Sequence, residues 1–345
     1  MSQVVLLIES SGVASMEIYK TEKGMYKKIQ RIASGAFSQV YIVKSVDTQR
    51  SYALTTFKGV EIPDFREHFR MAYNALKGIH HKNLVSVKEV GISSEGVSYA
   101  VTNYLEGTTT LHEFVSERKE PLDSGSVASI GIQICEGLHA LHTNMIIHGD
   151  LNANNVLIAE DKSVKIIDFG LAQVPSEASL SKSPASSALW HYVGGAFGYM
   201  APELFSDPLR RSTQSDIYSL GCVLYFLLAG LPLVGSYRRP SEIRRDIPRQ
   251  WDMIIEGCSA PNPQMRFGTV DEVAEALRKL PKIGIRSVVN RRPSFDFALF
   301  LGMLAFNMGW LVSRSANVGA LCLVLSWIAA YFCLRWLYAC AEGPT

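Results

Sequence analysis

The sequence lacks an excess of charge of either sign, because 34 lysine and arginine residues face 32 aspartate and glutamate residues for a formal net charge of +2. Nucleic-acid-binding domains carry a basic footprint that this nearly neutral chain does not show, so we expect no nucleic acid among its partners. Cysteine occurs six times, but in neither paired nor zinc-binding spacing. That pattern fits a reducing cytosolic setting for the main domain.

A secretory signal is also missing. The first residues, MSQVVLLIES, contain no basic residue, and their apolar run is far too short for a signal peptide. We expect residues 1–25 to form an N-terminal extension of one or two strands, around Val4–Ile8 and Met16–Tyr19.

Charged residues are absent from two stretches near the other end, Ala298 to Val312 and Val318 to Leu334, with a short turn between them. Each stretch is slightly short of the roughly 20 residues that span a bilayer, but the tandem favours a transmembrane helical hairpin over residues 298–338. Small residues recur on one face of each stretch and would let two helices approach closely. They permit a homodimer as readily as an internal hairpin, so the oligomeric state stays open. A hydrophobic tail buried in a soluble protein is the alternative.

Arginines around these stretches predict their orientation. Arg286, Arg291 and Arg292 precede the first stretch and Arg335 ends the second, whereas Arg314 alone lies in the turn. Cytoplasmic loops carry the excess of basic residues. We therefore expect the basic linker 281–297, the tail 339–345 and the main domain to lie on the cytoplasmic side of the membrane.

Residues 148 to 170 concentrate the groups of a metal and phosphate site. Asp150 and Asn155 lie on one loop, and the apolar runs Val156–Ile158 and Val164–Ile167 predict two strands joined by five intervening residues. A hairpin of that length returns Asp168 to the side of Asn155. Their oxygen atoms could then hold Mg²⁺ against the phosphates of a nucleotide while Asp150 faces the acceptor.

Short motifs in a fixed order resemble those of the eukaryotic-type Ser/Thr protein kinases from about Tyr26 to Leu280. They are HGDLNANN at 148–155, DFG at 168–170, APE at 201–203, SDIYSLG at 215–221 and PNPQMR at 261–266. The resemblance implies an α+β, bilobal fold over residues 26–280, with a small β-rich N-lobe and a larger helical C-lobe. It also implies ATP and Mg²⁺ as cofactors, although function must be argued from the site itself.

The same resemblance assigns site residues. Asp150 would be the catalytic base, and Asn155 and Asp168 the metal ligands. The nucleotide contacts would come from the glycine-rich loop, from the adenine-sandwiching residues and from the hinge, that is from Gly35, Val40, Ala53, Thr102, Tyr104 and Leu157. Simple core packing is an equal alternative for the apolar members. Supports of the fold are matched as well: Glu203 would pair with Arg266, and Leu76, Val87, His148 and Phe169 would stack above Asp216.

A pair of opposite charges that the family keeps in its N-lobe is absent. Thr55 stands where the family has the phosphate-binding Lys, and Ala72 stands where it has the Glu partner of that Lys. Lys58 could replace the missing Lys only if its strand ended early. Losing one charge would leave the other unpaired in a cleft, so the joint absence indicates real divergence.

The catalytic loop diverges in the same direction. Gly149 replaces an Arg that clamps phosphorylated activation loops, Asn152 replaces the catalytic-loop Lys, and Ala196 replaces the Thr that bridges that Lys. If each of the two missing lysines contributed about 3 kcal/mol to the transition state, their loss would slow phosphotransfer roughly 10⁴-fold.

The sequence therefore favours a membrane-anchored pseudokinase that binds nucleotide and Mg²⁺ weakly and acts as a signalling or scaffold module for a cytosolic protein partner. The alternative is an active Ser/Thr kinase that transfers the γ-phosphate of ATP to protein Ser or Thr with unusual phosphate contacts. Asp150, Asn155 and Asp168 support that alternative.

Two further segments allow two interpretations each. The serines between Ser176 and Ser187 indicate either phosphorylation sites or a solvated loop. The arginines between Arg238 and Arg249 indicate either a surface for anionic lipid or a partner, or an ordinary solvated face.

Overall fold

The computed structural model describes residues 18–21, 23–34, 38–57, 63–93, 96–169, 172, 197–207, 210–233 and 237–281, with only the backbone of residues 63–68 and 197. The chain divides into two compact units, Met1–Ile283 and Gly284–Thr345, and the described residues all belong to the first. Several predicted features lie outside them: the strand at Val4–Ile8, Gly35, Lys58, the serines 176–187, Ala196 and both apolar stretches. No helix among the described residues is long and apolar enough to cross a membrane.

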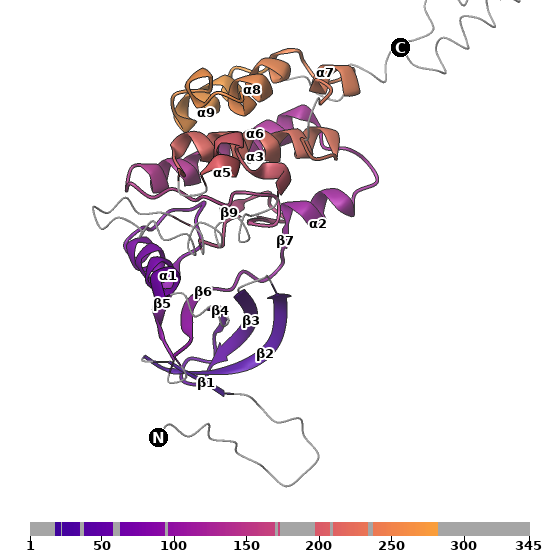
Figure 1. Ribbon diagram of the computed structural model, residues 1–345. Coiled ribbons are helices and arrows are strands. Elements are labelled where there is room, and N and C mark those ends of the chain that lie inside the picture. Colours follow the sequence, from indigo (N-terminus) through magenta and orange to yellow (C-terminus); the bar gives the residue numbers. More distant parts are fainter. Residues whose placement is uncertain are drawn as a thin grey trace, which may run out of the picture. The chain divides into compact units, whose positions relative to one another are not determined.

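The N-lobe is a curled sheet of six antiparallel strands in the order β1-β2-β3-β4-β6-β5, with helix α1 beside β5 and β6 (Figure 1). The strands are β1 (Ile18–Lys20), β2 (Met25–Ser34), β3 (Ser38–Ser45), β4 (Ser51–Phe57), β5 (Val87–Ile92) and β6 (Ser98–Asn103), and α1 covers Pro63–Leu76.

Alternation along β4 gives the sheet two different faces. Tyr52 and Leu54 join a separate N-lobe core with Tyr26, Val43, Tyr99 and Val101. Ala53 and Thr55 point to the opposite face, because successive side chains of a strand alternate. Val40 is the register partner of Thr55 on β3 and lies on that same face.

A buried carboxylate ties the N-lobe together away from that face. Glu89 on β5 accepts hydrogen bonds from the hydroxyls of Tyr26 (3.2 Å) and Tyr99 (2.7 Å) and from the backbone N–H of Lys23 (3.2 Å). Buried carboxylates need such donors, since an unpaired buried charge is costly. The turn between β1 and β2 is thereby fixed to β5 and β6.

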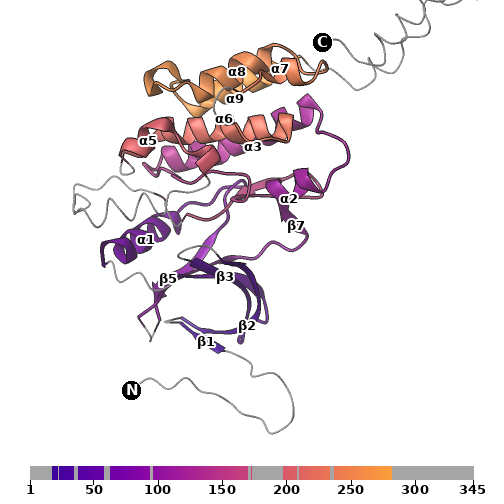
Figure 2. The ribbon, with the colours of Figure 1, turned by 45° about the vertical axis from the view of Figure 1, so that its right-hand side comes forward.

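The C-lobe consists mainly of helices around a central pair, α3 (Ser124–His142) and α6 (Thr213–Ala229). Helix α9 packs on α3 and α8 packs on α6, so that two layers of helices are visible in Figure 2. Gly131 lets α3 and α6 approach, because an added Cβ there would lie 2.7 Å from the Leu224 side chain. The remaining helices are α2 (Leu111–Ser116), α5 (Pro202–Ser206), α7 (Pro240–Ile243), α8 (Gln250–Ser259) and α9 (Val270–Arg278), with 3₁₀ turns at Phe197–Tyr199 and Pro263–Met265.

A second sheet of three strands, β7 (Thr108–Thr110), β8 (Val156–Ala159) and β9 (Val164–Ile166), carries the predicted hairpin. Strands β8 and β9 pair antiparallel with Val156 opposite Ile166. Lys162 adopts φ 64° in the turn between them. The two strands predicted from the apolar runs are therefore confirmed.

A side-chain cap sets the start of the central helix α3. The helix begins at Ser124, because the Asp123 carboxylate accepts the N–H of Ser126 (2.8 Å) and caps the first turn. It ends at His142.

Candidate nucleotide and metal site

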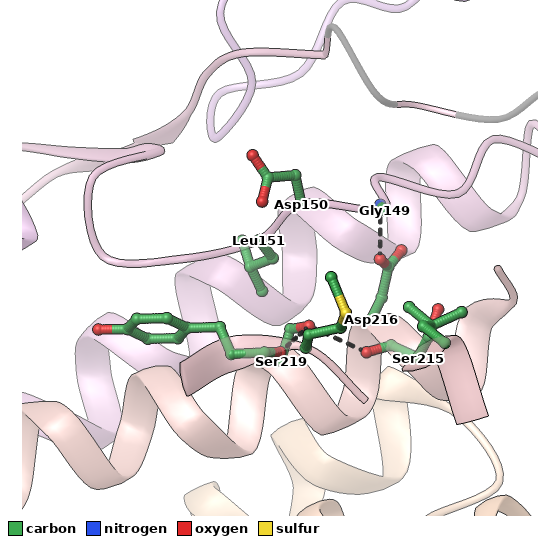
Figure 3. A pocket seen from close by; sticks show the side chains of 9 residues that line it. Gly149, Asp150, Leu151, Ser215, Asp216 and Ser219 are labelled. Atoms are coloured by element: carbon green, nitrogen blue, oxygen red, sulfur yellow. Dashed lines mark hydrogen bonds between the residues drawn. The ribbon is translucent and has the colours of Figure 1, made fainter. Parts of the chain in front are cut away.

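The loop that carries the predicted base is held from below by Asp216 in the first turn of α6. Its carboxylate accepts the backbone N–H groups of His148 (2.9 Å) and Gly149 (2.9 Å) and the ring N–H of His142 (2.8 Å). Figure 3 shows Asp216 directly beneath Gly149. Burial would raise the pKa of Asp216, but His142 and the backbone donors hold it below its ordinary value. A charged acceptor thus fixes the catalytic loop to the C-lobe core.

Two asparagine side chains orient Asp150. The Asn155 amide nitrogen donates to the Asp150 backbone carbonyl (2.8 Å) and carboxylate (3.0 Å), and the Asn152 amide nitrogen donates to the same two groups (3.0 and 3.3 Å). The Asn152 oxygen also accepts the N–H of Asn154 (2.9 Å). Asn152 therefore braces the loop from the position where the family has a cation. Sequence reasoning predicted the lost charge but missed this role.

The carboxyl group of Asp150 has a pKa near neutral pH. Burial, followed by the negative charge of Asp168, raises its pKa from 3.8 to about 7, although Arg211 and the two asparagine amides act in the opposite direction. A carboxylate with such a pKa can both hold and release a proton near pH 7, which is what a general base requires. The role of Asp150 as the catalytic base stays a prediction.

Arg211, on the loop before α6, is a residue that sequence reasoning missed. It is buried, and its Nε donates to the Gly149 carbonyl (3.2 Å). Burial lowers its pKa to about 10, while the charges of Asp150 and Asp216 act to raise it. Position 149 has φ 75°, which suits glycine. The guanidinium of Arg211 therefore brings a positive charge to the catalytic loop from outside that loop, and this charge interacts with the carboxylates of Asp150 and Asp216.

Asp168 comes back to the catalytic loop as the hairpin length predicted. The N–H of Ile167 donates to the Asn155 carbonyl (2.9 Å), so the residue after Ile167 lies beside that loop. Asp168 adopts φ 60°, a left-handed conformation that a residue other than glycine keeps only where its surroundings impose it. Phe169 is fully buried and its ring packs edge-on against His148 at 5.5 Å.

A divalent cation fits this arrangement through oxygen atoms. The Asn155 amide nitrogen faces two acceptors on Asp150, so the amide orientation is fixed and the amide oxygen lies on the other side. Amide and carboxylate oxygens, here those of Asn155 and Asp168, are ligands that Mg²⁺ prefers. No group of three or more His, Cys, Asp or Glu in the described part of the chain could hold a metal alone. Phosphate or water oxygens would have to complete the coordination.

Four of the remaining predicted nucleotide contacts lie on strands, Val40 on β3, Ala53 on β4, Thr102 on β6 and Leu157 on β8, whereas Tyr104 follows β6 and Gly35 lies outside the described residues. Val40, Ala53, Tyr104 and Leu157 are half-buried, and Thr102 is buried opposite Ala53 in the pairing of β4 with β6. Leu157 is opposite Thr110 in the pairing of β7 with β8. Their roles as adenine contacts stay predictions.

The departures in the N-lobe are equally plain in the structure. Thr55 and Ala72 are both buried, with 8% and 1% of their surface exposed. Uncharged side chains therefore fill the two positions where the family has its Lys and Glu. Leu76, Val87 and Phe169 belong to the large core of the domain, and His148 is buried beside it. Of the stack predicted above Asp216, the contact of His148 with Phe169 and the bond of the His148 backbone N–H to Asp216 are present, and the rest stays a prediction.

Other predicted contacts can be located as well. Arg266 donates to both oxygens of Glu203 (2.8 and 2.7 Å), which confirms the predicted ion pair. In the arginine cluster, Arg239 pairs with Glu256 (2.8 Å) and Arg244 donates to the carbonyls of Leu122 (2.8 Å) and Leu228 (3.2 Å). Arg244 thus has a structural role, which reduces the basic surface expected from the sequence.

The bilobal fold and this site together define a class of protein. The sequence profile of the family described as protein kinase domain matches residues 26–300, and the chain therefore belongs to the protein kinase domain family. Members of this family bind ATP and Mg²⁺ in general.

Among curated proteins, the similar ones are kinases. Cyclin-dependent kinase 10 of Homo sapiens is 29% identical over 266 residues, which cover 75% of this chain and 65% of that protein. Serine/threonine-protein kinase PrkC of Bacillus subtilis is 28% identical over 274 residues, or 75% of this chain and 41% of that protein. Serine/threonine-protein kinase PknH of Mycobacterium tuberculosis is 26% identical over 269 residues, which cover 73% of this chain and 41% of that protein. The chain spans less than two thirds of the length of these relatives.

The raised pKa of Asp150 predicts a pH dependence of stability. A carboxyl whose pKa is about 7 in the folded protein, against an ordinary 3.8 in the unfolded chain, binds its proton more tightly when folded. Its contribution to the free energy of unfolding therefore falls as pH rises from about 4 to about 7. Asp150→Asn has no such group. From pH 5 to pH 7.5 its free energy of unfolding should therefore rise by on the order of 2 kcal/mol relative to that of the wild type. Thermal melts of both proteins without metal measure this, and parallel curves would contradict it.

Proposed function

We propose that the chain is a membrane-anchored, kinase-like binding module that takes up nucleotide with Mg²⁺ and has lost, or nearly lost, phosphotransfer. Its nucleotide-dependent state would be recognised by a cytosolic protein partner. The observation that carries this proposal is the contrast within one site: the base and the metal ligands are kept in an ordered array, while uncharged residues occupy the places of the phosphate-binding lysines.

Retention of binding is supported by the hydrogen bonds around Asp150. Asn155 is held by that residue, and Asp168 follows a strand that pairs with the segment after Asn155. The conformation of Asp168 is strained in isolation, and its persistence implies that the surrounding structure maintains it. Bound Mg²⁺ would neutralise phosphate charge, and these two residues would orient it.

Loss of phosphotransfer is supported by the residues at the cation positions. Asn152 uses its amide on Asp150 and on the N–H of Asn154, so no donor with a positive charge approaches a phosphoryl group from there. Thr55 is buried and short. Arg211 is a cation near Asp150, but its Nε donates to the Gly149 carbonyl and its charge interacts with the carboxylates of both Asp150 and Asp216.

Binding is tested by thermal shift of the full chain with and without ATP and Mg²⁺. We expect nucleotide with metal to raise the melting temperature more than either component alone, because binding to the folded state alone stabilises it. No shift at millimolar nucleotide would remove the binding part of the proposal.

The membrane part of the proposal rests on the sequence of residues 298–338. We expect the full chain to stay with membranes after an alkaline carbonate wash. Leu304→Arg combined with Leu323→Arg should release it, because each arginine at the centre of a span costs about 2.5–3.5 kcal/mol. Leu231→Arg, at a residue of the kinase domain that is 60% exposed, is the matched control and should leave the chain in the membrane.

The wild-type chain in the soluble fraction would contradict the anchor. Labelling of the kinase domain from outside intact cells would contradict its cytoplasmic orientation.

An active Ser/Thr kinase is the second candidate, favoured by one observation. Asp150 keeps a pKa of about 7 beside both metal ligands, as a working base would. In that case Mg²⁺ alone would supply most of the positive charge around the phosphates.

A further inference from the structure

Tyr73 on α1 joins three elements that meet at the nucleotide site. Its hydroxyl accepts the backbone N–H of Phe169 (3.3 Å). Burial raises the pKa of this hydroxyl, whereas the side chain of Thr55 on β4 lies close enough to act to lower that pKa. Only 1% of Tyr73 is exposed. One neutral side chain thus connects α1, the central strand of the N-lobe and the segment that carries Asp168.

Aromatic packing fixes the position of that hydroxyl. The Tyr73 ring lies 4.6 Å from the ring of Phe69 on the same helix and 6.1 Å, edge-on, from the ring of Phe169. Phe57, at the end of β4, packs on Phe69 at 5.2 Å. Offset and edge-on contacts of this kind restrict ring orientation and add to the burial energy. The hydroxyl therefore has little freedom to leave its partners.

We propose that Tyr73 is the positioning residue that holds α1 and Asp168 in place, in the role that an ion pair between Lys and Glu would otherwise fill. The inference rests on the proposed function, since it concerns the same metal site. Thr55 and Ala72 cannot form an ion pair, and Tyr73 is the neighbour of Ala72 on the helix. Its hydroxyl satisfies the buried N–H of Phe169 with a neutral group, so no charge has to be desolvated.

The bond to Phe169 acts directly on Asp168. The N–H of Phe169 belongs to the peptide group that follows the Cα atom of Asp168, so anchoring it restrains ψ of Asp168. That residue has φ 60°, a conformation that is uncommon for residues other than glycine and that needs support from neighbouring groups. By fixing the peptide group after Asp168, the Tyr73 hydroxyl therefore orients the Asp168 carboxylate without itself contacting the metal ion or the nucleotide.

Tyr73→Phe tests the inference, with Tyr99→Phe as the matched control. Both tyrosines are buried in the N-lobe and both use their hydroxyl in a hydrogen bond, but Tyr99 donates to Glu89 (2.7 Å), away from the metal ligands. Both variants should melt at lower temperature than the wild type. Only Tyr73→Phe should speed hydrogen exchange of the Phe169 amide in the protein without ligand. Unchanged exchange at that amide would overturn the inference.

The second readout is a titration with Mg²⁺ at fixed ATP, followed by thermal shift. We expect Tyr73→Phe to raise the Mg²⁺ concentration for half-maximal stabilisation up to about tenfold, as the loss of one net hydrogen bond implies, and Tyr99→Phe to leave it unchanged. Equal midpoints for the two variants would overturn the inference. If the wild type itself does not respond to Mg²⁺ and ATP, the proposed function fails, and hydrogen exchange at Phe169 then decides the role of Tyr73.

Discussion

Asp216→Ala is expected to lower the free energy of unfolding by about 3–5 kcal/mol, the cost of removing one member of a buried charged network. Its carboxylate is 1% exposed and accepts two backbone N–H groups of the catalytic loop and the ring of His142. Without it these donors would be buried and unpaired. For a domain of this size the melting temperature should fall by about 10 °C, which calorimetry or circular dichroism can measure.

Asp252→Ala provides the control for this prediction. Asp252 is also a buried carboxylate in the C-lobe, but it accepts hydrogen bonds from Ser241, far from the catalytic loop in sequence. Its loss should destabilise the domain without changing the response of the remaining folded protein to nucleotide and Mg²⁺. An Asp216→Ala protein that melts like the wild type would show that the loop is supported in another way.

Asp168→Ala is expected to remove the metal-dependent part of nucleotide binding. With ligand at 100 times its dissociation constant, binding stabilises the folded state by about 2.7 kcal/mol, and a 100-fold weaker affinity reduces this to about 0.4 kcal/mol. The additional thermal shift produced by Mg²⁺ over nucleotide alone should therefore nearly vanish. Thermal shift with ATP, with and without Mg²⁺, measures the difference between the two proteins.

Asp161→Ala is the matched control for Asp168→Ala. Asp161 lies in the turn of the same hairpin and is exposed, with its carboxylate accepting the N–H of Ser163 (2.8 Å). The response of this variant to Mg²⁺ should equal that of the wild type. If Asp168→Ala also kept the full response, Mg²⁺ would bind elsewhere and the assignment of this residue would be wrong.

Sequence reasoning reached the site by local spacing and by the family resemblance. The hairpin between Asn155 and Asp168 followed from two short apolar runs, whose neighbours in the chain restrict where they can lie. The pair of Glu203 and Arg266 joins residues 63 positions apart and was predicted only because the motifs resemble those of the family.

The parts that sequence reasoning missed depend on tertiary contacts. Arg211 reaches Gly149 from a loop 62 residues away, and nothing around it in the sequence marks it. Tyr73 follows Ala72, the position where the family has a charge, and its hydroxyl meets partners 96 residues away in the case of Phe169. Asn152 was recognised as a lost lysine, but its brace on Asp150 required the folded loop.

These residues give the divergence a common physical basis. At or next to positions where the family has charged side chains, this chain has neutral donors and acceptors: Tyr73 accepts the N–H of Phe169, and Asn152 bonds within the catalytic loop. A neutral hydrogen bond at these positions avoids the cost of leaving a buried charge unpaired. The side chains of Thr55 and Asn152 bring no positive charge towards a transferring phosphoryl group.

The central claim is tested most directly by incubating the purified full chain with radiolabelled ATP and either Mg²⁺ or Mn²⁺, beside Asp168→Ala. We predict no transfer of label to a protein substrate or to the chain itself above the level of the variant, in a protein that nevertheless shows a thermal shift with ATP and metal. Turnover by the wild type that Asp168→Ala abolishes would contradict the account and identify the chain as a working kinase.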